Sequence, residues 1–217
     1  MKTDIKIQQD VQAELRWEPS IDAARIGVEV TEGIVTLTGH VGSFAEKWDA
    51  ERVAQRVAGV RALTVSLSVA LPDGNQREDA EIARSAEHAL EWGAYVPKTG
   101  VKVMVEGGYV TLSGTVDWEY QRQAAASSVR GLMGVTGVSD QIAIQPKVAV
   151  SEVKSEIESA LRRSAMADAK QVQVSVHGTN VTLTGVVHSW AERYTARHAA
   201  WGTHGVCNVA DHILVAS

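Results

Sequence analysis

The sequence predicts an α+β fold of three tandem αββαβ modules, each a three-stranded sheet with two helices on one face. Three observations predict it: a strand-like segment that occurs three times, a helical apolar stripe before each copy, and an alternating strand after each copy. The repeated segment reads GIVTLTGHV from Gly33, GYVTLSGTV from Gly108 and TNVTLTGVV from Thr179. The offsets of 75 and 71 residues between these copies also align the rest of the chain.

The first helix of each module is predicted by apolar residues at positions i, i+4 and i+8. This spacing places one apolar ridge on one face of a helix, with charged residues between its members. The three stripes are Ile7, Val11 and Leu15; Ile82, Ala86 and Leu90; and Val153, Ile157 and Leu161.

A strand and a tight turn come next in each module. Apolar residues alternate with a period of two from Ile26, Val101 and Val172 onward, which is typical of a strand with one buried face. Residues that tolerate a positive φ follow at 32–33, 107–108 and 178–180, so a hairpin should lead into the repeated segment. The glycines inside that segment predict a close approach of another backbone; they are Gly39, Gly114 and Gly185.

A second helix and a third strand complete each module. Ser43 with Glu46, and Ser189 with Glu192, have the spacing of a capping box at a helix start. Gly-Val pairs at 59–60, 134–135 and 205–206 suit the left-handed conformation that ends a helix, and alternating strands follow them. Pro72 and Pro146 close the first two modules, so the predicted boundaries are 1–72, 76–146 and 148–217. Modules this short bury little surface, so we expect contacts between them.

Composition excludes several classes of partner. With 26 acidic and 21 basic residues the net charge is −5, so the whole molecule is not attracted to nucleic acid, and we predict no nucleic-acid partner. The single Cys207 cannot form an internal disulfide, and no stretch of 18 apolar residues occurs. The first 15 residues contain no continuous apolar segment of the kind that a signal peptide needs. These features predict a cytoplasmic protein.

The residues do not predict an enzyme, a cofactor or a metal site. The sequence lacks a phosphate-binding glycine loop, a GxSxG segment and an HExxH segment. Ser43 and Ser189 are explained as helix caps. The histidines and cysteine near the end of the chain match no standard zinc spacing. Asp140 and Asp211 share the parity of the apolar residues in their strands, so we expect them to point inward and to accept hydrogen bonds from a nearby turn.

Six tryptophans against one phenylalanine provide the candidate contact residues. Trp17 and Trp92 occupy matching positions at the end of the first helix, Trp190 matches Phe44 at the start of the second helix, and Trp118 lies one position away. Indole rings at helix ends suit contact with a lipid surface or a protein partner, and packing between modules is the alternative. The predicted contact residues are Trp17, Trp92, Trp118, Trp190, Arg162 and Arg163.

The arginines enter this set because charge is unevenly distributed. From 8 basic and 10 acidic residues in 1–72, 6 and 10 in 73–146, and 7 and 6 in 147–217, the modules carry −2, −4 and +1. Five of the seven histidines also lie in the third module. Arg162 and Arg163 stand where the other modules have a tryptophan, so the third module is the predicted place for contact with an anionic surface.

Taken together, these motifs resemble the BON domain family, named for bacterial osmotically induced and nodulation proteins. The resemblance rests on the Val-Thr-Leu-x-Gly-x-Val segment, the Gly-Val pair and the Val-x-Asp-x-Ile third strand, and it covers nearly the whole chain three times. Val65 departs from it by standing where Asp140 and Asp211 stand. The resemblance implies a bacterial, non-enzymatic binding or scaffold protein associated with osmotic or envelope stress, with peripheral binding to a phospholipid membrane surface.

Two alternatives to lipid binding stay open. One is a protein–protein interaction or self-assembling module, in which tryptophans and sheet edges mediate the contacts. The other is a sensor of a small cation, because some members of the family look like potassium binders that use backbone oxygens.

Overall fold

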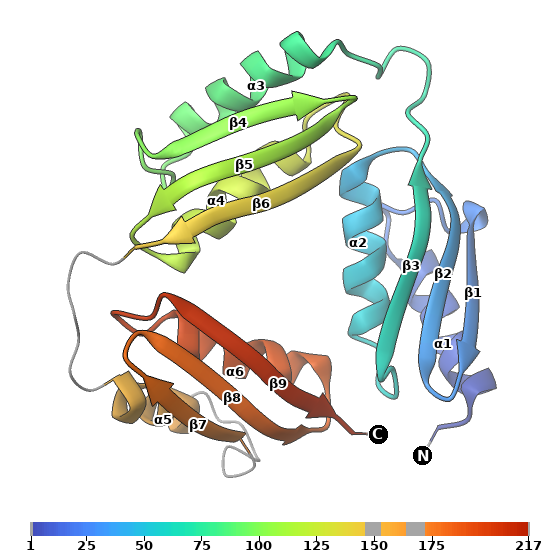
Figure 1. The fold of residues 1–217 in the computed structure, drawn as a ribbon. Helices are drawn as coiled ribbons and strands as arrows, with labels where there is room; N and C mark the ends of the chain where they lie inside the picture. Colours follow the sequence, from blue (N-terminus) through green and yellow to red (C-terminus); the bar gives the residue numbers. More distant parts are fainter. Residues whose placement is uncertain (1, 146–152, 164–171, 217) are drawn as a thin grey trace.

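The computed structural model describes residues 2–145, 153–163 and 172–216, with only the backbone described for 153 and 161–163. Within these residues the chain forms three separate sheets of three strands, each with two helices (Figure 1). The first module contains α1 (Asp4–Trp17), a short 3-10 turn (Ala23–Arg25), β1 (Ile26–Thr31), β2 (Ile34–Val41), α2 (Phe44–Gln55) and β3 (Ala62–Val69).

The second and third modules repeat this order of helices and strands. The second module contains α3 (Asp79–Trp92), β4 (Val101–Glu106), β5 (Tyr109–Val116), α4 (Glu119–Arg130) and β6 (Gly137–Ile144). The third contains α5 (Val153–Arg163), β7 (Val172–His177), β8 (Asn180–Val187), α6 (Trp190–Trp201) and β9 (Asn208–Val215). The predicted αββαβ class is therefore confirmed.

All three sheets have the same topology and register. The repeated segment forms the central strand, paired antiparallel with the preceding strand and parallel with the following one. Leu37, for example, lies opposite Val28 in β1 and Val65 in β3. The second helix provides the crossover that a parallel pair requires. Both helices of each module pack on the same core, which explains why one face of each sheet is covered.

An aspartate at the start of the first helix holds the hairpin turn. The carboxylate of Asp4 accepts hydrogen bonds from the backbone N–H groups of Glu32 (2.8 Å) and Gly33 (2.9 Å). Asp79 accepts the equivalent bonds from Gly107 and Gly108, both at 2.8 Å. Each aspartate also places negative charge at a helix N-terminus, where it is favourable. The helix and the hairpin of a module are thereby joined by a charge-assisted contact.

The predicted helix caps are confirmed, and the predicted close approach of another backbone is confirmed at the strand glycines Gly39 and Gly114. Ser43 Oγ accepts from the Glu46 N–H at 3.1 Å, and Ser189 Oγ accepts from the Glu192 N–H at 3.2 Å. Gly114, in β5, has a φ of 120°, and a Cβ there would overlap the carbonyl oxygen of Gly100. The neighbouring Thr115 N–H donates to that same oxygen at 2.9 Å, so this close approach keeps the strand ladder intact.

The three modules contact one another in a closed, head-to-tail arrangement (Figure 1). Phe44, at the start of α2, packs against the core of the second module. Trp118, next to the start of α4, contacts His204 of the third module. Trp190, at the start of α6, donates a hydrogen bond to the backbone carbonyl of Val60 in the first module. Each contact uses the start of a second helix, so the heterologous interfaces close into a triangle. The expected contacts between modules are therefore present.

No helix in the described ranges combines the length and the apolar character that a bilayer crossing would require.

Candidate functional site

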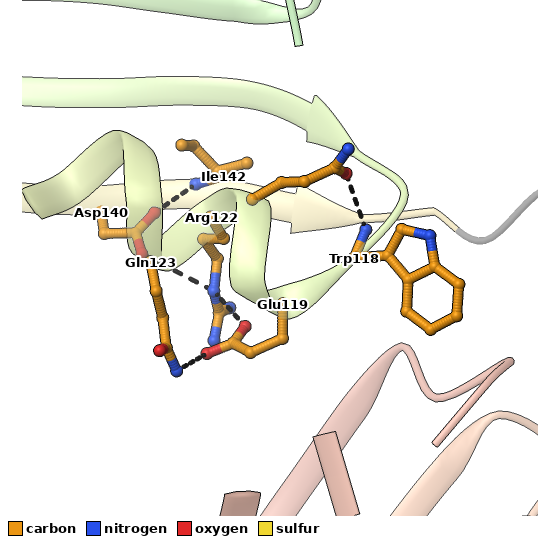
Figure 2. Close-up of polar contacts among 7 residues, drawn as sticks. Trp118, Glu119, Arg122, Gln123, Asp140 and Ile142 are labelled. Carbon is orange, nitrogen blue, oxygen red and sulfur yellow. Dashed lines mark hydrogen bonds and ion pairs between the residues drawn. The ribbon is translucent and has the colours of Figure 1, made fainter. Parts of the chain in front are cut away.

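The contact between the second and third modules is organised by the start of α4 (Figure 2). Gln121 Oε1 accepts hydrogen bonds of 3.0 Å from the backbone N–H groups of both Asp117 and Trp118. The side chain of Trp118 points from this turn toward the third module. There its ring meets the ring of His204 edge-on, with 4.5 Å between centroids.

Glu119, in the first turn of α4, is a buried carboxylate with only 7% of the residue exposed. Its Oε1 accepts a 3.0 Å hydrogen bond from Gln123 Nε2, and its Oε2 lies 2.7 Å from Arg122 Nε. The geometry of the Nε–Oε2 contact is not that of a hydrogen bond, and neither atom has a hydrogen-bond partner among the described residues. Electrostatic attraction therefore offsets the cost of burying this carboxylate.

Arg122 connects Glu119 to two further groups. Its Nε lies 3.6 Å from Asp140 Oδ2 on β6, and its guanidinium lies 4.9 Å from the ring centre of Trp201 in the third module. Trp201 is half-buried and packs against the cores of both modules. One arginine thus makes an ion pair within its module and a cation–π contact with the next.

The arginine–aspartate pair recurs in the third module and is therefore architectural. Arg193 Nε lies 2.8 Å from Asp211 Oδ2, and the offset of 71 residues aligns this pair with Arg122 and Asp140. The expectation that a turn binds these aspartates is wrong. Each accepts from the N–H two residues later in its own strand, at 3.0 Å in β6 and 3.1 Å in β9. Burial also differs, because the side chain of Asp140 is 29% exposed and that of Asp211 is 11% exposed.

Glu119, in contrast, occurs in one module only. The aligned positions are Phe44 and Trp190, which both contact the next module with a large aromatic ring. The second module places a carboxylate at this position. Features that recur between copies serve the fold, so this difference marks the interface between the second and third modules as the candidate site.

A cavity of about 340 Å³ adjoins Glu119 at this interface. Its walls are mainly aromatic, and the last turn of α6 closes one side; the lining residues are Trp118, Glu119, Tyr120, Gln123, His198, Trp201 and Gly202. A second hollow of about 650 Å³ shares Trp118, His198 and Gly202 and extends to Glu156 on α5. Apolar walls with a few placed polar groups are typical of sites for small organic molecules. The described residues contain no cluster of three or more side chains suited to holding a metal ion.

The tryptophans predicted as contact residues fall into two groups. Trp17 and Trp92 are 79% and 77% exposed at the ends of α1 and α3. Trp118 and Trp190 are partly buried and contact a neighbouring module. The side chains of Arg162 and Arg163 lie outside the described residues. Sequence reasoning missed Glu119, Arg122 and Trp201, although the alignment of Glu119 with two aromatic residues was a usable signal.

A different stack of side chains joins the first and second modules. Two guanidinium groups lie close to the ring centre of Trp48, on α2: that of Arg52 at 4.6 Å and that of Arg130 at 3.7 Å. Burial lowers the pKa of Arg130, and the nearby charge of Arg52 acts in the same direction. Burial also raises the pKa of the Glu51 carboxyl in the same region. The interface between the first and second modules thus contains an arginine–tryptophan contact, as does the interface between the second and third modules.

The sequence profile of the BON domain matches the chain three times, at residues 3–70, 78–146 and 149–217. The chain belongs to the BON domain family. This BON protein is 33% identical over 143 residues to osmotically-inducible protein Y of Escherichia coli (strain K12), a match that covers 64% of this chain and 71% of that protein.

Similar solved structures add little to this assignment. CdsD, a structural protein of the type III secretion system of Chlamydia trachomatis, has a TM-score of 0.27 and 15% identity, covering 96% of the BON protein and 91% of that chain. The periplasmic domain of the type III secretion inner membrane protein PrgH from S. typhimurium has a TM-score of 0.23 and 13% identity, covering 88% and 100%.

Proposed function

We propose that this BON protein is a non-enzymatic, stress-associated binding protein that attaches peripherally to phospholipid surfaces through the ends of its first helices. The observation that supports this is the exposure of Trp17 and Trp92, the two most exposed large apolar side chains among the described residues. An indole ring combines a large apolar area with a polar N–H, which suits the boundary between lipid and water. The association with osmotic stress rests on the name of the relative.

The closed arrangement explains how several helix ends could act together. Trp17 and Trp92 occupy aligned positions, and corresponding positions of a head-to-tail ring lie at one level about its axis. The aligned residue of the third module is Arg163, preceded by Arg162. Two indoles and a basic pair would combine apolar insertion with attraction to anionic headgroups.

Vesicle co-sedimentation tests this proposal. The wild type should bind vesicles that contain phosphatidylglycerol more strongly than pure phosphatidylcholine vesicles, and more strongly at low salt. The double variant Trp17→Ala/Trp92→Ala should bind at least about tenfold more weakly, because two large apolar side chains no longer enter the membrane. Its matched control is Met104→Ala/Leu214→Ala, which removes two other exposed apolar side chains.

Two results would overturn the lipid assignment: no binding of the wild type to any vesicle, or equal binding by the double variant and the wild type. A protein partner is the competing occupant of the same tryptophans. If the exposed indoles mediated self-association, light scattering without vesicles would show oligomers of the wild type that the double variant does not form.

A further inference from the structure

The cavity between the second and third modules has the chemistry of a site for a small organic cation. We propose that it binds a methylated ammonium group of the choline type. This site is separate from the exposed helix ends, because neither Trp17 nor Trp92 lines it.

Aromatic rings form most of the wall. Trp118, Tyr120 and Trp201 all line the cavity, and the first two rings lie 6.4 Å apart at an interplanar angle of 33°. Aromatic faces attract cations, and several converging rings bind quaternary ammonium groups. The guanidinium of Arg122, 4.9 Å from the centre of Trp201, shows that one of these rings already accepts a cation.

The charges around the cavity also favour a cation. Glu119 lines it and is buried, and Glu119, Asp140 and Arg122 together carry a net charge of −1, because one arginine pairs with both carboxylates. Glu156 lies on the adjoining wall. Gly202 and His198 bring the C-terminal end of α6 to the cavity, where the helix dipole is negative. The module that supplies Glu119 also has the most negative net charge of the three. Its residues 73–146 include 6 basic and 10 acidic side chains, which give −4.

The arrangement of acceptors favours a methylated over a primary ammonium group. A primary ammonium carries three N–H donors and needs acceptors for each of them. Oε1 of Glu119 already accepts from Gln123, and its Oε2 faces Arg122. A quaternary ammonium has no N–H and needs only apolar contact and negative potential, which these walls provide. A volume of about 340 Å³ lies at the small end of ligand sites, where a compact molecule fits.

Calorimetric titration of the three-module protein with choline chloride tests this inference, with sodium chloride matching the ionic strength. The neutral isostere 3,3-dimethyl-1-butanol has the same shape without the charge. Choline should bind at least about tenfold more tightly than the isostere, because the cation–π contribution is lost with the charge. Glu119→Gln should reduce this preference, whereas Glu87→Gln, which removes a charge from an exposed position on α3, should retain it.

A second variant distinguishes a loss of choline binding from a loss of folding. Tyr120 is 51% exposed, so Tyr120→Leu should leave the thermal unfolding midpoint close to that of the wild type while weakening choline binding. The same headgroup occurs free and in phosphatidylcholine, so vesicles of this lipid form a separate arm. Binding of free choline supports the small-molecule source, and Glu119-dependent binding of these vesicles alone supports the lipid source.

Three outcomes would overturn the inference. These are no binding of choline in either form, equal affinity for choline and its isostere, or unchanged choline binding by folded Glu119→Gln. None of them bears on Trp17 and Trp92, because the vesicle assay with the double tryptophan variant tests that proposal independently.

Discussion

The indole Nε1 of Trp190 donates a 2.8 Å hydrogen bond to the backbone carbonyl of Val60, 130 positions earlier in the chain. This bond joins the third module to the first. Because the first module contacts the second and the second contacts the third, it completes the triangle. Its removal should therefore affect the arrangement of all three modules.

Trp190→Phe keeps a large ring but removes the donor. The free energy of unfolding should fall by about 1 kcal/mol, the typical contribution of one hydrogen bond. Chemical denaturation measures this change, and small-angle X-ray scattering should show a larger radius of gyration. Trp17→Phe, the same exchange at an exposed position, should change neither quantity. An unchanged radius and stability for Trp190→Phe would mean that other contacts hold this interface.

The stack of Arg130 on Trp48 should contribute measurably to the interface between the first two modules. A guanidinium over a partly desolvated indole contributes about 0.5–2 kcal/mol. A double-mutant cycle with Arg130→Gln and Trp48→Leu should therefore give a coupling free energy within that range. The cycle with Arg52→Gln should give a smaller coupling, because Arg52 is exposed and lies farther from the ring. Equal coupling for the two arginines would contradict the role assigned to Arg130.

Glu51 should make stability depend on pH in the direction opposite to that of a typical paired carboxylate. Burial raises the pKa of this carboxyl in the folded state above its ordinary value of 4.5, and the charges of Lys47 and Arg130 oppose the rise. The folded state thus holds the proton more tightly than the unfolded state. The resulting stability is fully present below the unfolded-state pKa and is lost as pH rises through the folded-state pKa.

Glu51→Gln should accordingly be more stable than the wild type at neutral pH, with the difference shrinking as pH falls below the ordinary value. Thermal unfolding across a pH series measures this difference. Glu87→Gln removes the same charge from an exposed helix and separates the local effect from the change in net charge. A difference that grows toward low pH would refute the assignment.

Gly114 should tolerate no side chain. Its φ of 120° is unfavourable for other residues, and a Cβ would overlap the carbonyl oxygen of Gly100. Gly114→Ala should lower the unfolding free energy by more than about 2 kcal/mol or prevent folding of the second module. Gly131→Ala, at a position with no heavy atom within 4 Å of the new methyl group, should change stability by less than about 1 kcal/mol.

The sequence predicted those structural features that depend on residues close to one another along the chain. Ser43 with Glu46 predicted a helix start, and the three aligned copies of the repeated strand predicted a common sheet. The hydrogen bonds from the hairpin turn to the Asp4 carboxylate were not predicted, because their donors lie 28 and 29 residues later in the chain. An aspartate at a helix start already has a sufficient local explanation, so nothing indicated a second role.

The interfaces were less predictable for a related reason. The presence of contacts followed from the small size of each module, but their geometry depends on the relative orientation of whole modules. Trp118 and Trp190 face neighbouring modules whereas Trp17 and Trp92 face solvent, although all four lie at or near helix ends. Glu119 was not predicted as a site residue. The alignment places it with Phe44 and Trp190, but the aromatic Trp118 beside it is the more obvious counterpart of those two rings.

In a linear array of repeats the outermost units have one neighbour each and fray first, so melting spreads inward from the ends. The bond between Trp190 and Val60 removes that distinction, because every unit of the triangle is flanked on both sides. Unfolding any one module therefore breaks two interfaces at once. This couples the unfolding of the three modules and favours a single cooperative transition.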